Sequence, residues 1–183
     1  MENDLWDLSF ISESNFNKCL LETISTYLKS IQSYTLKKFN NNIIDSIKLI
    51  FDLKVNNLSL EDMISREVIR QIDKSNNNAI GYFHQNLFKY IKYCEVPNSG
   101  FDVIFNKDNC TIYVELKNKH NTTNSDSGKS IYRRFLKKIT ESPSSYCFLV
   151  GVVSKESKNE IWKIKDYDVS THIRRVSIDL FYE

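Results

Sequence analysis

Three side chains in the second half of the sequence are of the types that hydrolyse phosphodiester bonds. Asp102 precedes the short motif Glu115-Leu116-Lys117. Such hydrolysis needs a water that loses a proton and groups that stabilise negative charge on the phosphorus oxygens. Mg²⁺ serves both needs and prefers a few hard oxygen ligands. Asp102, Glu115 and the Leu116 carbonyl are therefore candidate metal ligands, and Lys117 is the candidate that orients or activates the water.

A β-hairpin is the element that must bring these groups together. Phe101 to Phe105 and Cys110 to Leu116 are short aromatic and β-branched segments, separated by a polar link that predicts a tight turn. Antiparallel pairing places Asp102 beside Glu115. Because side chains alternate along a strand, Glu115 and Lys117 project from one face. Two carboxylates this close repel each other, so we expect a cation to relieve the repulsion.

The bare pattern also has a structural explanation, a solvated salt bridge at a strand end. Three features favour a catalytic site. The flanking strands are strongly apolar, a polar loop follows at once, and the next helix, from about Gly128 to Glu141, is basic. Six basic side chains in this region would lie within reach of a phosphate backbone: Lys119, Lys129, Arg133, Arg134, Lys137 and Lys138. A charge-rich helix is also commonly a solvated face, and that alternative stays open.

Helices are predicted for the first half of the chain. Apolar residues recur at helical spacing from Phe16 to Ile31, from Ile43 to Leu53 and from Ile64 to Ile72. A fourth helix is expected to start near Asn78, because the run of asparagines that ends there indicates a turn between two helices. Ser59, followed three residues later by Asp62, resembles a capping box that opens the third helix.

Strands are predicted for the second half. Besides the hairpin, short apolar segments indicate strands at Tyr146 to Val153, Glu160 to Ile164 and Arg175 to Ile178. This order predicts an α/β (α+β) protein with a mixed central β-sheet flanked by helices. We expect one domain over residues 1–183, mainly helical over 1–93 and β-rich over 94–183.

Composition indicates a globular protein but does not reveal its partner. The 183 residues are 41% hydrophobic, and 25 basic against 23 acidic residues leave a net charge of +2, which does not by itself indicate a polyanion partner. The four cysteines lie in apolar stretches, which predicts reduced thiols and a cytoplasmic protein. No signal peptide and no bilayer-spanning apolar run is expected, so we predict no membrane contact.

The motif resembles the signature of a known nuclease superfamily. Asp102 with Glu115-Leu116-Lys117 is similar to the PD-(D/E)XK pattern, with Phe101 where that superfamily often has proline. The resemblance implies a restriction-endonuclease-like core. It also implies that Asp102, Glu115 and Lys117 are the catalytic residues.

The longer stretches Ser75 to Gln85 and Val114 to Thr122 resemble the type II restriction endonucleases of the Eco47 type. Members of that family cut short palindromes of the GGNCC or GGWCC kind. The resemblance runs from about Phe39 to the end of the chain. It implies Mg²⁺-dependent cleavage of both strands of double-stranded DNA by a homodimer, since two-fold DNA calls for a two-fold reader. A cognate DNA methyltransferase is the implied genetic partner.

The resemblance also singles out residues outside the motif. Those in the loop after the second hairpin strand are candidates for contacting DNA or supporting the site: Asn118, His120, Asn121, Thr122 and Asn124. They could equally cap the loop. His84 and Gln85 lie where the superfamily often places an extra metal-site or water-site group, although a lone His beside an apolar stripe is commonly structural. Glu67 is a weaker rival one helix earlier.

Two other functions remain open at this point. One is a structure-specific PD-(D/E)XK nuclease of DNA repair or recombination. The other is a non-catalytic DNA-binding module, against which the intact Asp102, Glu115 and Lys117 argue. The resemblance implies that family members continue past Glu183, so we expect a C-terminal family segment to be absent here, with an effect on dimerisation or DNA grip.

Overall fold

The computed structural model describes residues 6–119 and 125–183, which divide into two compact units. The sheet unit comprises the chain up to Cys19 and the segment Gly81–Glu183. The helical unit comprises Leu20–Ile80. All three candidate catalytic residues belong to the sheet unit. The expectation of one domain over residues 1–183 stays a prediction.

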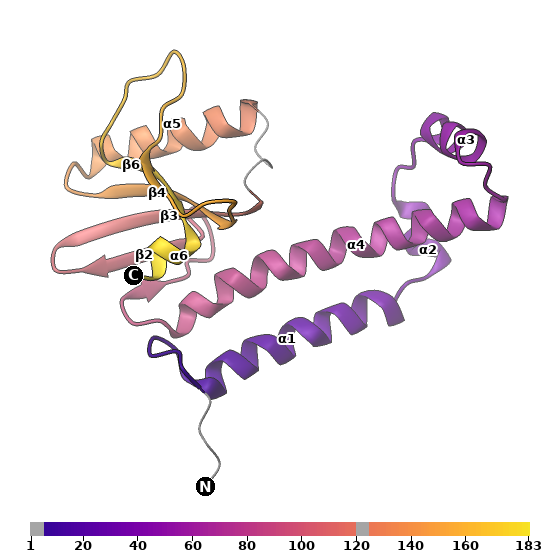
Figure 1. The fold of residues 1–183 in the computed structure, drawn as a ribbon, viewed down its shortest axis with the longest axis horizontal. Coiled ribbons are helices and arrows are strands. Elements are labelled where there is room, and N and C mark those ends of the chain that lie inside the picture. Colours follow the sequence, from indigo (N-terminus) through magenta and orange to yellow (C-terminus); the bar gives the residue numbers. More distant parts are fainter. Residues whose placement is uncertain (1–5, 120–124) are drawn as a thin grey trace, which may run out of the picture. The chain divides into compact units, whose positions relative to one another are not determined.

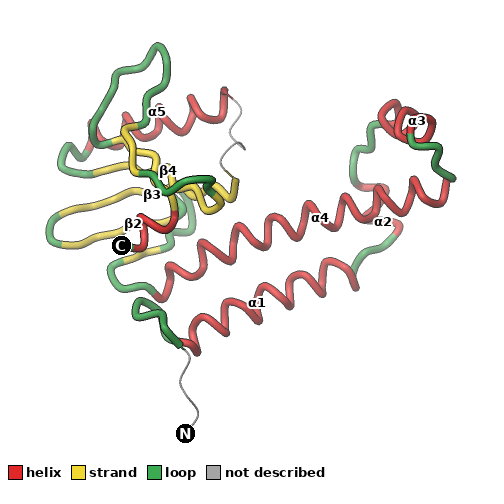
Figure 2. Tube along the Cα trace, in the orientation of Figure 1, coloured by secondary structure: helices red, strands yellow, loops and turns green. Residues whose placement is uncertain are grey.

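Six strands of the described chain form one mixed sheet in the order β1-β2-β3-β4-β6-β5. They are β1 (Cys94–Glu95), β2 (Val103–Lys107), β3 (Cys110–Lys119), β4 (Tyr146–Val153), β5 (Asn159–Ile161) and β6 (Ile173–Ser177). Figure 2 shows the strands in yellow, with β2, β3 and β4 labelled. β3 and β4 are parallel, as are β4 and β6, whereas the remaining pairs are antiparallel. The predicted α/β class with a mixed sheet is confirmed.

The hairpin of β2 and β3 is closed by a two-residue turn. Asp108 and Asn109 have φ angles of 49° and 63°, which is the left-handed geometry of a type I′ turn. Val103 pairs with Val114 across the hairpin, and both side chains are fully buried. The predicted hairpin is confirmed, although β2 starts two residues later than the apolar segment suggested.

Each face of the sheet carries its own hydrophobic core. Helix α5 (Ser125–Glu141) lies along one face (Figure 1), where buried side chains of α5, β4, β6 and the segment after β5 pack together: Ile131, Tyr132, Phe135, Cys147, Leu149, Trp162 and Ile173. The short helices η1 (Phe88–Tyr90) and α6 (Ile178–Tyr182) cover the other face. Alternation along β3 sends Tyr113 to the α5 face and Val114 to the opposite face.

A single helix, α4 (Leu60–Leu87), replaces the two helices predicted on either side of the asparagine run. The predicted break was wrong because polar side chains in this run find partners without leaving the helix. Asn77 donates to Asp73 one turn earlier, and the amide oxygen of Asn76 accepts a hydrogen bond from Ser30. The predicted capping box is confirmed, since the Asp62 N–H donates to the Ser59 hydroxyl at 3.0 Å.

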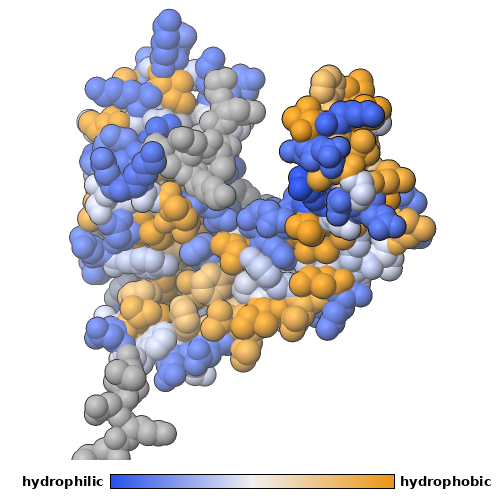
Figure 3. All heavy atoms as spheres, turned by 45° about the vertical axis from the view of Figure 1, so that its right-hand side comes forward, coloured by the Kyte–Doolittle hydropathy of each residue, from blue (hydrophilic) through white to orange (hydrophobic). Residues whose placement is uncertain are grey.

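The helical unit contains α2 (Leu36–Asn41), α3 (Ser46–Val55) and most of α1 (Glu13–Gln32) and α4. Helix α2 was not predicted. Helix α3 starts later than expected, because the Asp45 carboxylate caps it by accepting the Lys48 N–H. Hydrophobic residues reach the surface of this unit (Figure 3), and those near or in α3 are exposed: Ile43, Ile47, Ile50, Phe51 and Val55.

None of the helices in the described part of the chain combines the length and the apolar composition needed to cross a membrane.

Phe88 provides a test of the core between η1 and α6. Its ring is 1% exposed and lies 5.6 Å from the ring of Phe181 and 5.5 Å from that of Tyr182. We expect Phe88→Ala to lower the free energy of unfolding by about 3–5 kcal/mol, because it opens a cavity. Urea unfolding followed by tryptophan fluorescence measures this, since Trp6 and Trp162 both belong to the sheet unit.

The matched control is Tyr82→Ala, which truncates an exposed ring of the same sheet unit. It should change stability by no more than about 0.5 kcal/mol. Equal effects of the two substitutions would contradict the assigned core.

Candidate active site

Asp102 is held at the start of the hairpin by three hydrogen bonds. Its backbone N–H donates to the Val114 carbonyl at 2.9 Å, and its own carbonyl accepts from Nε2 of Gln85 at 3.1 Å. Its carboxylate oxygen Oδ2 accepts the backbone N–H of Leu116 at 2.8 Å. The Asp102 carboxylate is therefore anchored to the strand that carries Glu115 and Lys117.

Glu115 lies on the α5 face of β3, and only 12% of its side chain is exposed. Its carboxylate is held between two cations. Nζ of Lys117 lies 2.8 Å from Oε1, and Nη2 of Arg134 on α5 donates to Oε2. Asp102, Glu115 and Lys117 thus lie together at one end of the hairpin, where the sequence placed them.

The two carboxylates of the site influence each other. Burial raises the pKa of Asp102 above its usual range, and the nearby charge of Glu115 raises it further. The Leu116 N–H and the charges of Lys117 and Arg134 act in the opposite direction. A cation placed between Asp102 and Glu115 would stabilise both as carboxylates.

The donor set suits a hard cation such as Mg²⁺. Within residues 6–119 and 125–183, no three His, Cys, Asp or Glu side chains gather as a complete protein cage for a metal. Mg²⁺ does not require one, because it retains several waters and takes only one or two carboxylates. The N–H and C=O of a strand residue point to the same side, so the Leu116 carbonyl opens toward Asp102. Each oxygen of Glu115 has a second lone pair for a metal.

Arg134 is positioned inside the site. Besides Glu115, its guanidinium donates to the Gly100 carbonyl at 3.0 Å and lies 5.0 Å from the centre of the Phe101 ring. These contacts tie α5 to the start of the hairpin. Arg134 was predicted as a DNA-binding or site-supporting residue, and its contacts in the structure are those of a residue that holds Glu115.

The other basic residues of α5 point in different directions. Arg133 is exposed and Lys129 is half-buried. Nζ of Lys137 and Nζ of Lys138 lie 3.9 Å and 3.8 Å from the Glu141 carboxylate, and Nζ of Lys138 also lies 4.6 Å from the centre of the Tyr113 ring. The basic helix is thus not one uniform cationic face, and its contact with DNA stays a prediction.

Three other predicted site residues make contacts outside the candidate centre. His84 packs edge-on against Phe83 at 5.4 Å, and burial lowers its pKa. Asn118 lies near α4, where its Nδ2 would be 3.5 Å from a Cβ at Gly81. Glu67 belongs to the helical unit, where its carboxylate accepts hydrogen bonds from Arg70 and Gln71.

Four predicted loop residues lie outside the described part of the chain: His120, Asn121, Thr122 and Asn124. The backbone of Lys119 ends β3. A contact of these residues with DNA stays a prediction.

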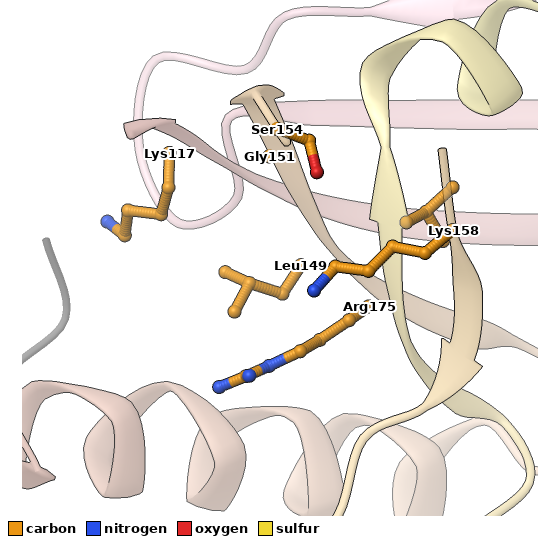
Figure 4. Close-up of a pocket in the computed structure, with 7 residues that line it drawn as sticks. Lys117, Leu149, Gly151, Ser154, Lys158 and Arg175 are labelled. Atoms are coloured by element: carbon orange, nitrogen blue, oxygen red, sulfur yellow. The ribbon is translucent and has the colours of Figure 1, made fainter. Parts of the chain in front are cut away.

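Two basic residues near Lys117 were not predicted. Arg175 on β6 and Lys158 before β5 line a pocket with Lys117, Leu149 and Gly151 (Figure 4). Arg175 could have been singled out as the charged residue in an otherwise uncharged predicted strand. Placing it beside Lys117 also required the register of that strand in the sheet.

The chain is similar to known proteins over most of its length. Residues 8–183 match the family described as Eco47II restriction endonuclease. The chain belongs to this family. The type II restriction enzyme Sau96I of Staphylococcus aureus is 32% identical over 168 residues, or 91% of this chain. The type II restriction enzyme Eco47II of Escherichia coli is 25% identical over 154 residues, or 81% of it. The resemblance to Eco47-type enzymes is confirmed.

The chain spans about two thirds of the length of these two relatives. The matched regions cover 64% of the Staphylococcus aureus enzyme and 63% of the Escherichia coli enzyme. All the residues of the candidate site lie within the matched region, from Gln85 through Asp102, Glu115 and Lys117 to Arg134.

Substituting Arg134 tests its role in holding Glu115. We expect Arg134→Met to lower the free energy of unfolding by about 1–2 kcal/mol, because the mostly buried Glu115 carboxylate loses one partner. Urea unfolding with tryptophan fluorescence measures the change. Arg133→Met removes the same charge from an exposed position on α5 and should stay within about 0.5 kcal/mol of the parent protein. An equally stable Arg134→Met protein would show that this contact does not hold the site together.

Proposed function

We propose that this chain is a type II site-specific deoxyribonuclease that hydrolyses phosphodiester bonds in double-stranded DNA at a short palindrome, with Mg²⁺ as cofactor. Membership of the Eco47II restriction endonuclease family supports the reaction class. The observation that carries the proposal is the convergence of Asp102, Glu115 and Lys117 at one end of the hairpin. A buried salt bridge alone would not require a second carboxylate beside Glu115.

In this proposal Asp102, Glu115 and the Leu116 carbonyl hold the metal ion. When bound, Mg²⁺ would polarise a phosphate oxygen and make a water more acidic. Lys117 keeps one N–H on Glu115 and has two more to offer to a water or a phosphate oxygen. Its positive charge stabilises the negative charge that develops on the phosphorus oxygens. Arg134 orients Glu115, and Gln85 orients the backbone at Asp102.

The proposed partners follow from the symmetry of the substrate. A palindromic duplex presents the same half-site twice, so we propose that two copies of the chain act as a homodimer. A DNA methyltransferase that protects the same site is the proposed genetic partner. All four cysteines are thiols that form no disulfide, which agrees with the proposed cytoplasmic location.

Cleavage of a panel of supercoiled plasmids tests the proposed function. We expect discrete fragments with one common end sequence in Mg²⁺ and no cleavage in EDTA. Glu115→Ala and Lys117→Ala should each slow cleavage at least about a hundredfold, because each removes a group that acts on the developing charge. Circular dichroism and DNA-binding titrations check that both variants stay folded and still bind DNA.

Lys163→Ala is the control, because Lys163 is an exposed cation of the sheet unit outside the site. It should cut like the parent protein. Persistent cutting by Glu115→Ala would refute the assigned centre. Cutting only at junctions or flaps would indicate a structure-specific nuclease, and binding without cutting would indicate a non-catalytic module.

A further inference from the structure

A small basic pocket lies beside the candidate active site, on the α5 face of the sheet. Its cavity has a volume of about 30 Å³ and is lined by residues of β3, β4, β6 and the segment between β4 and β5. In Figure 4 the side chains of Lys158 and Arg175 both extend toward the side on which Lys117 lies. Because Lys117 belongs to the candidate centre, whatever binds in this pocket lies next to the reacting group.

Gly151 leaves the floor of this pocket open. It is the parallel partner of Lys117 in the sheet, so the two positions share a face. A Cβ built at Gly151 would meet no atom of the described residues within 4 Å. Glycine inside a strand weakens the strand and often marks a place where a ligand approaches the backbone closely. Gly151 interrupts the run Phe148–Val153, whose other residues all carry large apolar side chains.

Arg175 brings a partly desolvated positive charge to the pocket. Its guanidinium lies 5.0 Å from the centre of the Trp162 ring, which is itself 2% exposed. Its Nε atom is buried and has no hydrogen-bond partner among the described residues. Burial lowers the pKa of Arg175, although the charge of Glu160 opposes the effect. Removing a cation from water without a full set of partners is costly, so an anion that reaches it would be bound strongly.

The charges around the pocket leave room for one anion. Glu160 is the register partner of Arg175 on β5, and its carboxylate lies 3.5 Å from Nζ of Lys158. Lys117 is paired with Glu115. With Arg134 and Asp102 of the candidate site included, four cations face three carboxylates in this region, which leaves one positive charge.

We propose that this pocket binds a backbone phosphate of the DNA next to the phosphate that is cut, with Arg175 as the main contact and Lys158 as the second. The proposal rests on the proposed function and adds to it a second contact between the protein and the DNA backbone. A cavity of about 30 Å³ admits the oxygens of one phosphate but not a nucleoside. A phosphate held here fixes the register of the strand without reading its sequence.

Single methylphosphonate substitutions in a DNA duplex test this assignment. The duplex contains the site identified from the plasmid fragments, and one phosphate at a time is made neutral, at the scissile position and at two positions on either side. Dissociation constants are measured by fluorescence anisotropy with Ca²⁺ in place of Mg²⁺, so that the strands stay intact. The proteins compared are the full chain and its Arg175→Met variant.

We expect one flanking methylphosphonate to weaken binding by the parent protein about tenfold. Arg175→Met should bind the unmodified duplex about tenfold more weakly and lose nothing further at that position, because the phosphate and the arginine form one contact. The slope of log K against log salt should fall by about one for Arg175→Met. Arg174→Met is the matched control, since Arg174 directly precedes Arg175 in β6, lies on the opposite face and donates to Asn159.

Gly151→Val provides an independent variant, because it fills the open floor of the pocket and leaves every charge in place. Coupling here means the loss of affinity when one phosphate is made neutral. Gly151→Val should abolish this loss at the same flanking phosphate, while circular dichroism and urea unfolding show a folded protein. Failure of both Arg175→Met and Gly151→Val to alter the response to any flanking methylphosphonate would overturn the proposal. So would coupling confined to the scissile phosphate.

The parent protein separates these outcomes from a failure of the proposed function. If it cuts plasmids at one sequence but shows no coupling, only the phosphate pocket is wrong. If it neither binds nor cuts double-stranded DNA, both proposals are wrong.

Discussion

Two carboxylates kept close together at the end of an otherwise apolar hairpin are the constraint on which the sheet unit depends. Neither Asp102 nor Glu115 is fully solvated, and burial together with the charge of Glu115 raises the pKa of Asp102. The fold offsets this cost with partners from several elements: the Leu116 N–H, the Lys117 ammonium and the Arg134 guanidinium. Helix α5 therefore contributes both a hydrophobic face and a counter-charge.

The parts of the site that lie within one hairpin could be predicted from the sequence. Alternation along a strand is a local property, so the common face of Glu115 and Lys117 follows from their spacing. The polar pair Asp108 and Asn109 supplies the left-handed turn that pairs Asp102 with the far end of β3. The capping box at Ser59 is local in the same sense.

The parts that depend on contacts between distant segments could not be predicted. The asparagine run at 76–78 has low helix propensity, but Asn76 finds a partner on another helix and α4 continues through it. Arg134 looked like one cation among several on α5 until the packing of α5 turned it toward Glu115. Arg175 lies far along the chain from Lys117, and only the order β3-β4-β6 brings them to one pocket.

The two-residue turn at Asp108 and Asn109 has a consequence for how such a gene can change. The turn sets the register of β3, and each residue added between it and Glu115 would reverse the face to which all later side chains of the strand point. A single-codon insertion or deletion there would move Glu115 and Lys117 away from α5. A second one would return them to that face but would shift Glu115 by about 7 Å along the hairpin from Asp102. Length variation between the turn and Glu115 is therefore expected to survive only when the segment between Asp102 and the turn changes by the same number of codons.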